Sequence, residues 1–106
     1  MDTFTNIETL EQFEKATQEK SVFLFTTDWC PDCLFIKPFI GEITKANPEF
    51  NYYVVDRDKH IDLCKHLDIM GIPSFVAFDA GHETGRMVNK LRKTKADIQS
   101  FINSVK

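Results

Sequence analysis

The sequence predicts an α/β sandwich, with a central mixed β-sheet and helices on both of its faces. Segments typical of strands alternate along the chain with segments of helical periodicity, and strands separated by helices pair in parallel through right-handed crossovers. Turn residues at 79–83 separate the last two strands, which adds an antiparallel edge. The 106 residues contain no repeat, linker or long charge block, so we expect residues 1–106 to form a single domain.

The N-terminal segment predicts a helix over about residues 6–18. Thr5 and Glu8 have the spacing of a capping box, with Thr5 at the N-cap. A short extra strand is possible just before this helix, around Thr3–Phe4. The expected buried stripe of the helix has helical spacing and consists of Ile7, Leu10, Phe13 and Ala16.

A buried strand over 22–26 is followed by a second helix that begins near Pro31. The strand is short, continuous and apolar, as central strands are. Proline is favoured at the first position of a helix. Pro38 lies within the helix and should kink it. The inward face of this helix recurs at steps of three and four residues and comprises Cys33, Ile36, Ile40 and Ile43.

The second half of the chain predicts three more strands and two helices. Strands are expected over 52–56, 74–78 and 84–88, the last two forming a hairpin. Asp58 is expected to cap a helix that extends to about Leu67. Thr94 and Asp97 begin the final helix. Its apolar face recurs at helical spacing and comprises Ile98, Phe101, Ile102 and Val105.

Composition argues against several classes of protein. The formal net charge is −3, with 16 acidic against 13 basic residues, which disfavours a nucleic-acid-binding surface. No apolar run exceeds 4 residues, so no membrane span is expected. The first residues have neither the basic nor the apolar region of a secretory signal, which favours the cytoplasm. The basic run over 90–95 is interpreted as a solvated loop before the last helix.

The cysteines at positions 30 and 33 carry the strongest chemical signal. They lie where a buried strand gives way to a helix, so Cys30 should occupy the helix N-terminus. Unpaired N–H groups and the helix dipole stabilise a thiolate at such a position. Cys33 follows one turn later and can form a disulfide with Cys30. The pattern predicts that the exposed cysteine attacks and the buried one resolves.

These residues together with more distant ones resemble the thioredoxin family. The resemblance extends over the whole chain and rests on Trp29-Cys30-x-x-Cys33, Pro38, Asp58, Gly71-Ile72-Pro73 and Gly81. The variant Trp29-Cys30-Pro31-Asp32-Cys33 is similar to that of small cytosolic thioredoxin-like proteins. The resemblance implies a thioredoxin-like fold, a cis Ile72–Pro73 peptide beside Cys30, and a substrate groove bordered by Trp29, Pro31, Ile72 and Pro73.

The function that follows is the reduction of protein disulfides by a Cys30/Cys33 dithiol. The resemblance implies no metal and no bound organic cofactor. Electrons would come from a thioredoxin-reductase-type enzyme or a low-molecular-weight thiol. We expect disulfide-bearing proteins as substrates and a monomer as the working form.

Three positions depart from the family pattern. Leu24 and Val54 stand where the family has a buried acid and its lysine partner, and Asn89 stands where a glycine is expected. Loss of the acid removes the usual proton acceptor for Cys33. Asp32 could replace that acceptor, or its charge could oppose a thiolate at Cys30.

Two alternatives belong to other classes of protein. A zinc module would use Cys30, Cys33 and Cys64 with His60 or His66. A thioredoxin-fold binding module would retain the motif for interaction, its weak chemistry explained by the apolar Leu24. Otherwise Cys64 is interpreted as a small apolar residue of a helix face, and the histidines as surface residues.

Overall fold

The structure, a computed structural model, describes residues 3–106, which form five strands and four helices. The elements alternate along the chain as predicted, but the extra N-terminal strand lies at Thr5–Asn6 and not at the expected Thr3–Phe4. The last strand begins at His82, two residues before the expected start, because the hairpin turn is confined to Ala80 and Gly81. In chain order they are β1 (Thr5–Asn6), α1 (Leu10–Ala16), β2 (Ser21–Thr26), α2 (Pro31–Ala46), β3 (Asn51–Asp56), α3 (Ile61–His66), β4 (Ser74–Asp79), β5 (His82–Met87) and α4 (Lys95–Ser104).

The strands form one mixed sheet in the order β1-β3-β2-β4-β5. β1 and β2 both pair in parallel with β3, whereas β4 is antiparallel to β2 and to β5. The hairpin between β4 and β5 turns through Ala80 and Gly81, both of which have positive φ. The predicted parallel sheet with an antiparallel edge is therefore confirmed.

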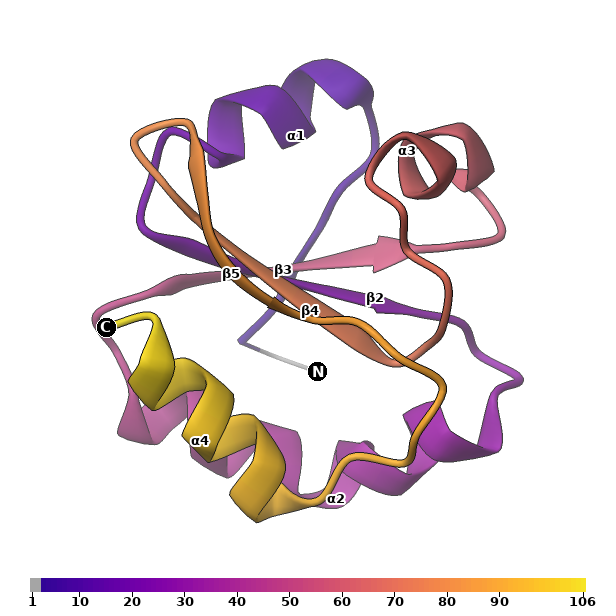
Figure 1. The fold of residues 1–106 in the computed structure, drawn as a ribbon, viewed down its shortest axis with the longest axis vertical. Helices are drawn as coiled ribbons and strands as arrows, with labels where there is room; N and C mark the ends of the chain where they lie inside the picture. The colour runs from indigo at the N-terminus through magenta and orange to yellow at the C-terminus, as the bar shows by residue number, and fades with distance from the viewer. Residues whose placement is uncertain (1–2) are drawn as a thin grey trace.

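Helices cover both faces of the sheet: α1 and α3 lie on one face, and α2 and α4 on the other (Figure 1). Each face has its own buried cluster. The α2/α4 side includes Leu24, Ile36, Ile40, Ile43, Phe75, Ile98 and Ile102. The α1/α3 side includes Phe13, Phe23, Phe25, Cys64, Val76 and Phe78. This double-sided core confirms the predicted sandwich.

The first helix begins later than the sequence predicts, and its predicted capping box was wrong. Thr5 lies in β1 and pairs with Tyr53 of β3. Because its backbone is extended in the sheet, Thr5 does not cap a helix. The cap is Thr9, whose hydroxyl accepts the Gln12 N–H at 3.1 Å. The predicted stripe is also broken, because Leu10 is exposed.

The helices that matter most for the site follow the sequence prediction closely. α2 begins at Pro31, and its inward residues are buried as predicted. The Thr94–Asp97 capping box of α4 is present. α3 differs, since His60 is its N-cap residue and makes no side-chain cap hydrogen bond. Among residues 3–106, no helix combines the length and the apolar character that crossing a bilayer requires.

Candidate active site

Cys30 is the N-cap residue of α2. β2 ends at Thr26, and after a short connection the chain enters the helix at Pro31, leaving Cys30 extended with φ −75° and ψ 120°. The Cys33 N–H points to the Cys30 sulfur at 3.4 Å. The same N–H also points to the Cys30 carbonyl oxygen at 3.1 Å, so the two acceptors share it. The sulfur therefore lies at the positive end of the α2 dipole, beside a backbone donor.

Cys33 lies one turn along on the inward face, with 1% of its surface exposed against 7% for Cys30. Burial raises the pKa of the Cys33 thiol, and its hydrogen bond with Cys30 adds to the rise, while Thr26 and Thr27 act in the opposite direction. The two sulfurs are therefore unequal. Cys30 is the more accessible one and Cys33 retains its proton.

The segment Gly71-Ile72-Pro73 lies directly beside Cys30. The Ile72–Pro73 peptide is cis, as the resemblance implied. The Cys30 sulfur is 4.0 Å from the Ile72 carbonyl oxygen. Pro73 is buried, and Ile72 is partly exposed. The structure thus brings two residues distant in sequence to the thiol pair.

Trp29 is 61% exposed, so it is a surface residue at the motif and not part of the core. Its indole N–H donates to the Asp58 carboxylate at 2.7 Å, and the Arg57 guanidinium lies 5.5 Å from the ring centre. The Trp29 hydrogen bond is the main cause that lowers the pKa of Asp58, with Arg57 adding to it. The predicted helix cap at Asp58 was wrong because its carboxylate is engaged by Trp29.

Asp32 turns toward the loop before α4. Its carboxylate pairs with the Arg92 guanidinium, with Nε and Oδ1 2.8 Å apart. The Arg92 guanidinium also lies 4.5 Å from the centre of the Phe35 ring. The negative charge between the two cysteines is therefore offset by a cation that the sequence analysis assigned to a solvated loop.

The positions of the absent acid and lysine face each other in the sheet. Leu24 of β2 and Val54 of β3 are register partners, and both contribute to the core beneath α2. Leu24 has no exposed surface. The place where the resemblance implies a buried charge pair is therefore an apolar contact in this chain.

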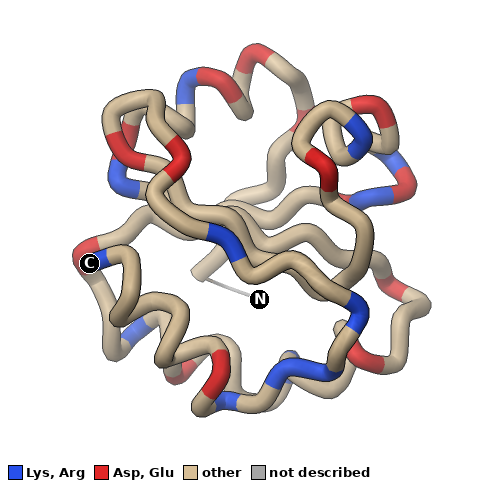
Figure 2. The backbone as a smooth tube through the Cα atoms, viewed as in Figure 1, with Lys and Arg blue, Asp and Glu red and all other residues tan. Residues whose placement is uncertain are grey.

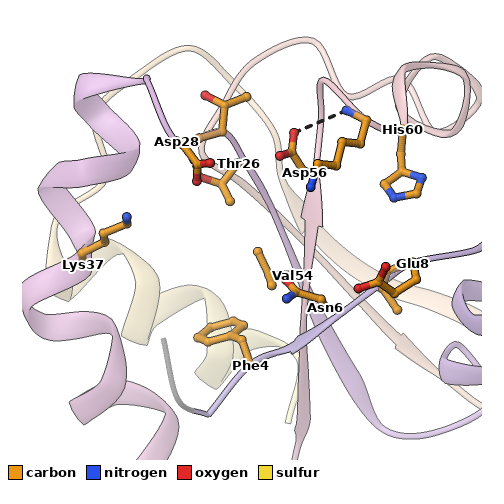
Figure 3. A pocket seen from close by; sticks show the side chains of 12 residues that line it. Phe4, Asn6, Glu8, Thr26, Asp28, Lys37, Val54, Asp56 and His60 are labelled. Carbon is orange, nitrogen blue, oxygen red and sulfur yellow. Dashed lines mark hydrogen bonds between the residues drawn. The ribbon is translucent and has the colours of Figure 1, made fainter.

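A polar cavity of about 530 Å³ opens near the ends of the three parallel strands (Figure 3). In Figure 3 Lys37 extends from α2 at one side, and His60 lies at the other. The buried Thr27 hydroxyl on its lining has no hydrogen-bond partner within residues 3–106. The lining mixes three acids and three bases, namely Glu8, Asp28, Asp56, Lys37, Lys59 and His60, and includes none of the residues predicted for the site.

Cys64 does not join the other two cysteines. It lies on α3 in the α1/α3 cluster, whereas α2 covers the opposite face of the sheet (Figure 1). All three cysteines are free thiols. No cluster of three His, Cys, Asp or Glu ligands suited to a metal occurs among residues 3–106. The geometry that the zinc alternative requires is thus not formed.

Sequence reasoning missed two exposed apolar residues near the motif segments. Met70, 75% exposed, immediately precedes Gly71. Leu91, 71% exposed, comes two residues after Asn89, whose carbonyl lies against Gly71. Neither has a periodic partner, so pattern analysis gave no signal. Met70 could have been identified because it precedes the Gly71-Ile72-Pro73 motif. Leu91 belongs to the loop that lies against Gly71, a contact that the sequence does not reveal.

A thiol at a helix N-terminus, a more deeply buried partner one turn on and a cis-proline segment alongside define a site for thiol–disulfide exchange on an α/β sandwich. The profile of the thioredoxin family, described as Thioredoxin, matches residues 4–104. The chain therefore belongs to the thioredoxin family. It is a dithiol thiol–disulfide oxidoreductase of that family.

Individual relatives agree with this assignment. The chain is 32% identical over 80 residues to a Thioredoxin H-type from Fagopyrum esculentum, covering 74% of this chain and 69% of that one. It is 30% identical over 74 residues to the mitochondrial Thioredoxin-2 of Schizosaccharomyces pombe, covering 70% of this chain and 56% of that one. The crystal structure of oxidised thioredoxin O1 from Arabidopsis thaliana superposes with a TM-score of 0.79 at 26% identity, over 97% of both chains.

Proposed function

We propose that this protein reduces disulfides of other proteins, with Cys30 as the nucleophile and Cys33 as the resolving thiol. The observation that carries the proposal is the inequality of the two sulfurs. Cys30 receives the Cys33 N–H at the start of α2, whereas Cys33 is buried and its pKa is raised by that burial. A nucleophile must be accessible, and Cys30 is the more exposed of the two sulfurs, at 7% against 1%.

The reaction proceeds in two exchanges. The Cys30 thiolate attacks one sulfur of the substrate disulfide, forming a mixed disulfide, while the other substrate sulfur departs with the bonding electrons and takes up a proton. Cys33 then loses its proton and attacks the Cys30 sulfur, forming the Cys30–Cys33 disulfide and releasing the second substrate thiol. The substrate gains two electrons and two protons, which the dithiol gives up.

Substrate docking is assigned to the surface around Cys30. We assign Trp29, Pro31, Ile72 and Pro73 to the border of the groove, and the Ile72 backbone to main-chain pairing with an extended substrate segment. The exposed Met70 and Leu91 enlarge the apolar area near that segment. These contacts would hold an extended, apolar stretch of a substrate protein across the thiol.

Regeneration requires an external donor of two electrons. We assign this role to a thioredoxin-reductase-type enzyme, with a low-molecular-weight thiol as the simpler substitute. We also assign the protein to the cytoplasm, as a monomer in which residues 1–106 act as one domain. The assignment rests on the chemistry of the proposed reaction, because a dithiol reductase needs surroundings that keep its thiols reduced, as the cytosol does. Cell fractionation and light scattering test the location and the monomer.

The test is a turbidimetric assay of insulin reduction, run once with dithiothreitol and once with NADPH and a thioredoxin reductase. The wild-type protein should accelerate precipitation above the reductant alone, and Cys30→Ser should remove that acceleration. Cys64→Ala is the matched control, because it removes a thiol outside the site. A rate equal to the reductant alone, or one that survives Cys30→Ser, would overturn the proposal.

A further inference from the structure

The loop between β5 and α4 packs on the thiol site instead of extending into solvent. Figure 2 shows basic residues following this loop past the first part of α2. The predicted solvated loop was wrong for Lys93, which is only 2% exposed. A lysine is rarely buried without a compensating partner, so this residue requires an explanation.

The Lys93 ammonium is held by the loop itself. It donates to the Asn89 carbonyl oxygen at 2.9 Å and to the Leu91 carbonyl oxygen at 2.7 Å. These bonds use two of the three N–H donors of the ammonium. These two bonds fix the cation in place but do not neutralise it.

The charges around Lys93 belong largely to the active site. Burial lowers the pKa of Lys93, and the negative charges of Asp32, Cys33 and Cys30 act against this fall, as does that of Asp97 on α4. Electrostatic attraction between two groups is mutual, so the ammonium must in turn favour negative charge on Cys30.

Arg92 acts on the same helix end from the solvent side. Its guanidinium pairs with Asp32 at 2.8 Å and covers Phe35, and both of these partners lie in the first turns of α2. An unpaired carboxylate next to Cys30 would oppose a thiolate there. The Arg92 side chain is 52% exposed, so salt will screen this pair more than it screens the buried Lys93.

The loop also lies against Gly71, on the other side of the site. A Cβ atom at this position would clash with the backbone carbonyl of Asn89, so the absence of a side chain lets the loop approach. The same Asn89 oxygen accepts the hydrogen bond from the Lys93 ammonium. Lys93 is thereby tied to the segment whose Ile72 carbonyl lies beside the Cys30 sulfur.

We propose that Lys93 and Arg92 are positioning residues for the thiol–disulfide reaction, which together sustain the Cys30 thiolate. Lys93 acts through its buried positive charge, and Arg92 acts by neutralising Asp32. The proposal rests on Cys30 being the nucleophile. It gives this chain a source of positive charge at the site, supplied by the loop before α4 while Leu24 and Val54 remain apolar.

The test measures the rate of Cys30 alkylation by iodoacetamide against pH, with the labelled peptide identified by mass spectrometry. All variants carry Cys64→Ala so that only the site reacts. Lys93→Met should move the alkylation profile to higher pH and slow the reaction at pH 7 by about three- to tenfold. Lys93→Arg should restore most of the rate. Lys90→Gln removes an exposed charge from the same loop and should leave the profile unchanged.

Arg92→Gln tests whether Arg92 acts by neutralising Asp32, because it leaves the buried Lys93 intact. It should slow alkylation by about two- to threefold, and Asp32→Asn should abolish this effect if Arg92 acts through Asp32. Circular dichroism shows whether Lys93→Met folds. If it does not, the double-mutant cycle of Arg92→Gln and Asp32→Asn decides, and additive effects of these two substitutions on the alkylation rate overturn the proposal.

Three other results overturn it. They are a folded Lys93→Met protein with an unshifted profile, an equal shift in Lys90→Gln, and a Lys93→Arg protein no faster than Lys93→Met. Failure of the proposed function gives a different result. In the protein that carries Cys64→Ala alone, iodoacetamide would then label a residue other than Cys30.

Discussion

Cys30 and Cys64 are both buried thiols, each on or beside a helix packed against the same sheet, yet their surroundings favour opposite chemistry. Cys30 precedes the first turn of α2 and receives a backbone N–H. Cys64 lies within α3 among apolar side chains, where burial raises the pKa of its thiol to about 11. We therefore expect the place of a cysteine relative to a helix N-terminus, and not its burial alone, to decide which of these two thiols reacts.

The largest expected effect comes from removing the Cys30 sulfur, the proposed nucleophile. Cys30→Ser should reduce insulin-reduction activity to the background of the reductant, because no other thiol is placed to replace it. Cys33→Ser should retain the first exchange and accumulate the mixed disulfide, which non-reducing electrophoresis detects. A loss of comparable size in Cys64→Ala would break the comparison.

The next effect concerns stability and belongs to Cys64. Its pKa is raised from an ordinary 9.0 to about 11, so above pH 9 the unfolded chain releases a proton that the native state keeps. The stabilisation is complete below pH 9 and is lost as the pH rises toward 11. We expect urea denaturation of the reduced protein to show a loss of about 2 kcal/mol across this range.

Cys64→Ala is the control for this pH dependence. It should cost about 1–2 kcal/mol at pH 7 through lost packing but should lack the Cys64 part of the alkaline decline. The decline caused by Tyr52 and Tyr53, whose pKa values are raised to about 12, is common to both proteins. If the free energy of unfolding falls with pH equally in the two proteins, the assignment of Cys64 as a buried, protonated thiol is contradicted.

A smaller effect is expected at Asp32. Asp32→Gly should favour the Cys30 thiolate and speed its alkylation at pH 6–7 by about two- to fivefold, because a negative charge near the sulfur is removed. Asp32→Asn removes the charge without the added flexibility of glycine and should give the same direction. An unchanged or slower alkylation in both variants would sink this prediction.

The smallest effect is expected at Trp29. Trp29→Phe keeps an aromatic surface but loses the hydrogen bond to Asp58. We expect the KM for a protein substrate to rise about two- to threefold, with a stability change within about 1 kcal/mol because the site is exposed. A large fall in kcat with an unchanged KM would assign Trp29 to the chemistry instead of to substrate contact.

Much of the fold and the core of the site could be predicted because their signals are local. Pro31 marks the start of α2, and the spacing of Cys33 with the following isoleucines fixes its inward face. The cis Ile72–Pro73 bond came from resemblance, because an X–Pro sequence alone favours trans. The thiol pair and its proline neighbour were therefore predictable, in part from residues and in part from the family.

The features that escaped prediction depend on contacts between distant segments. Thr5 has the spacing of a helix cap, but β3 recruits it into the sheet. Asp58 has the chemistry of a cap, but Trp29 engages its carboxylate. Lys93 sits in a basic run typical of solvent-exposed loops, but it is buried, and its ammonium donates to the Asn89 and Leu91 carbonyl oxygens. For Thr5 and Asp58 a tertiary partner competes successfully with the local preference.

The most direct test of the contrast between the thiols is to trap the first exchange. The Cys33→Ser protein is treated with a disulfide-bearing peptide at pH 7, and the adduct is located by peptide mass spectrometry. The account predicts a mixed disulfide on Cys30, with Cys64 modified only after the protein is denatured. An adduct on Cys64 in the native protein, or none on Cys30, would contradict it.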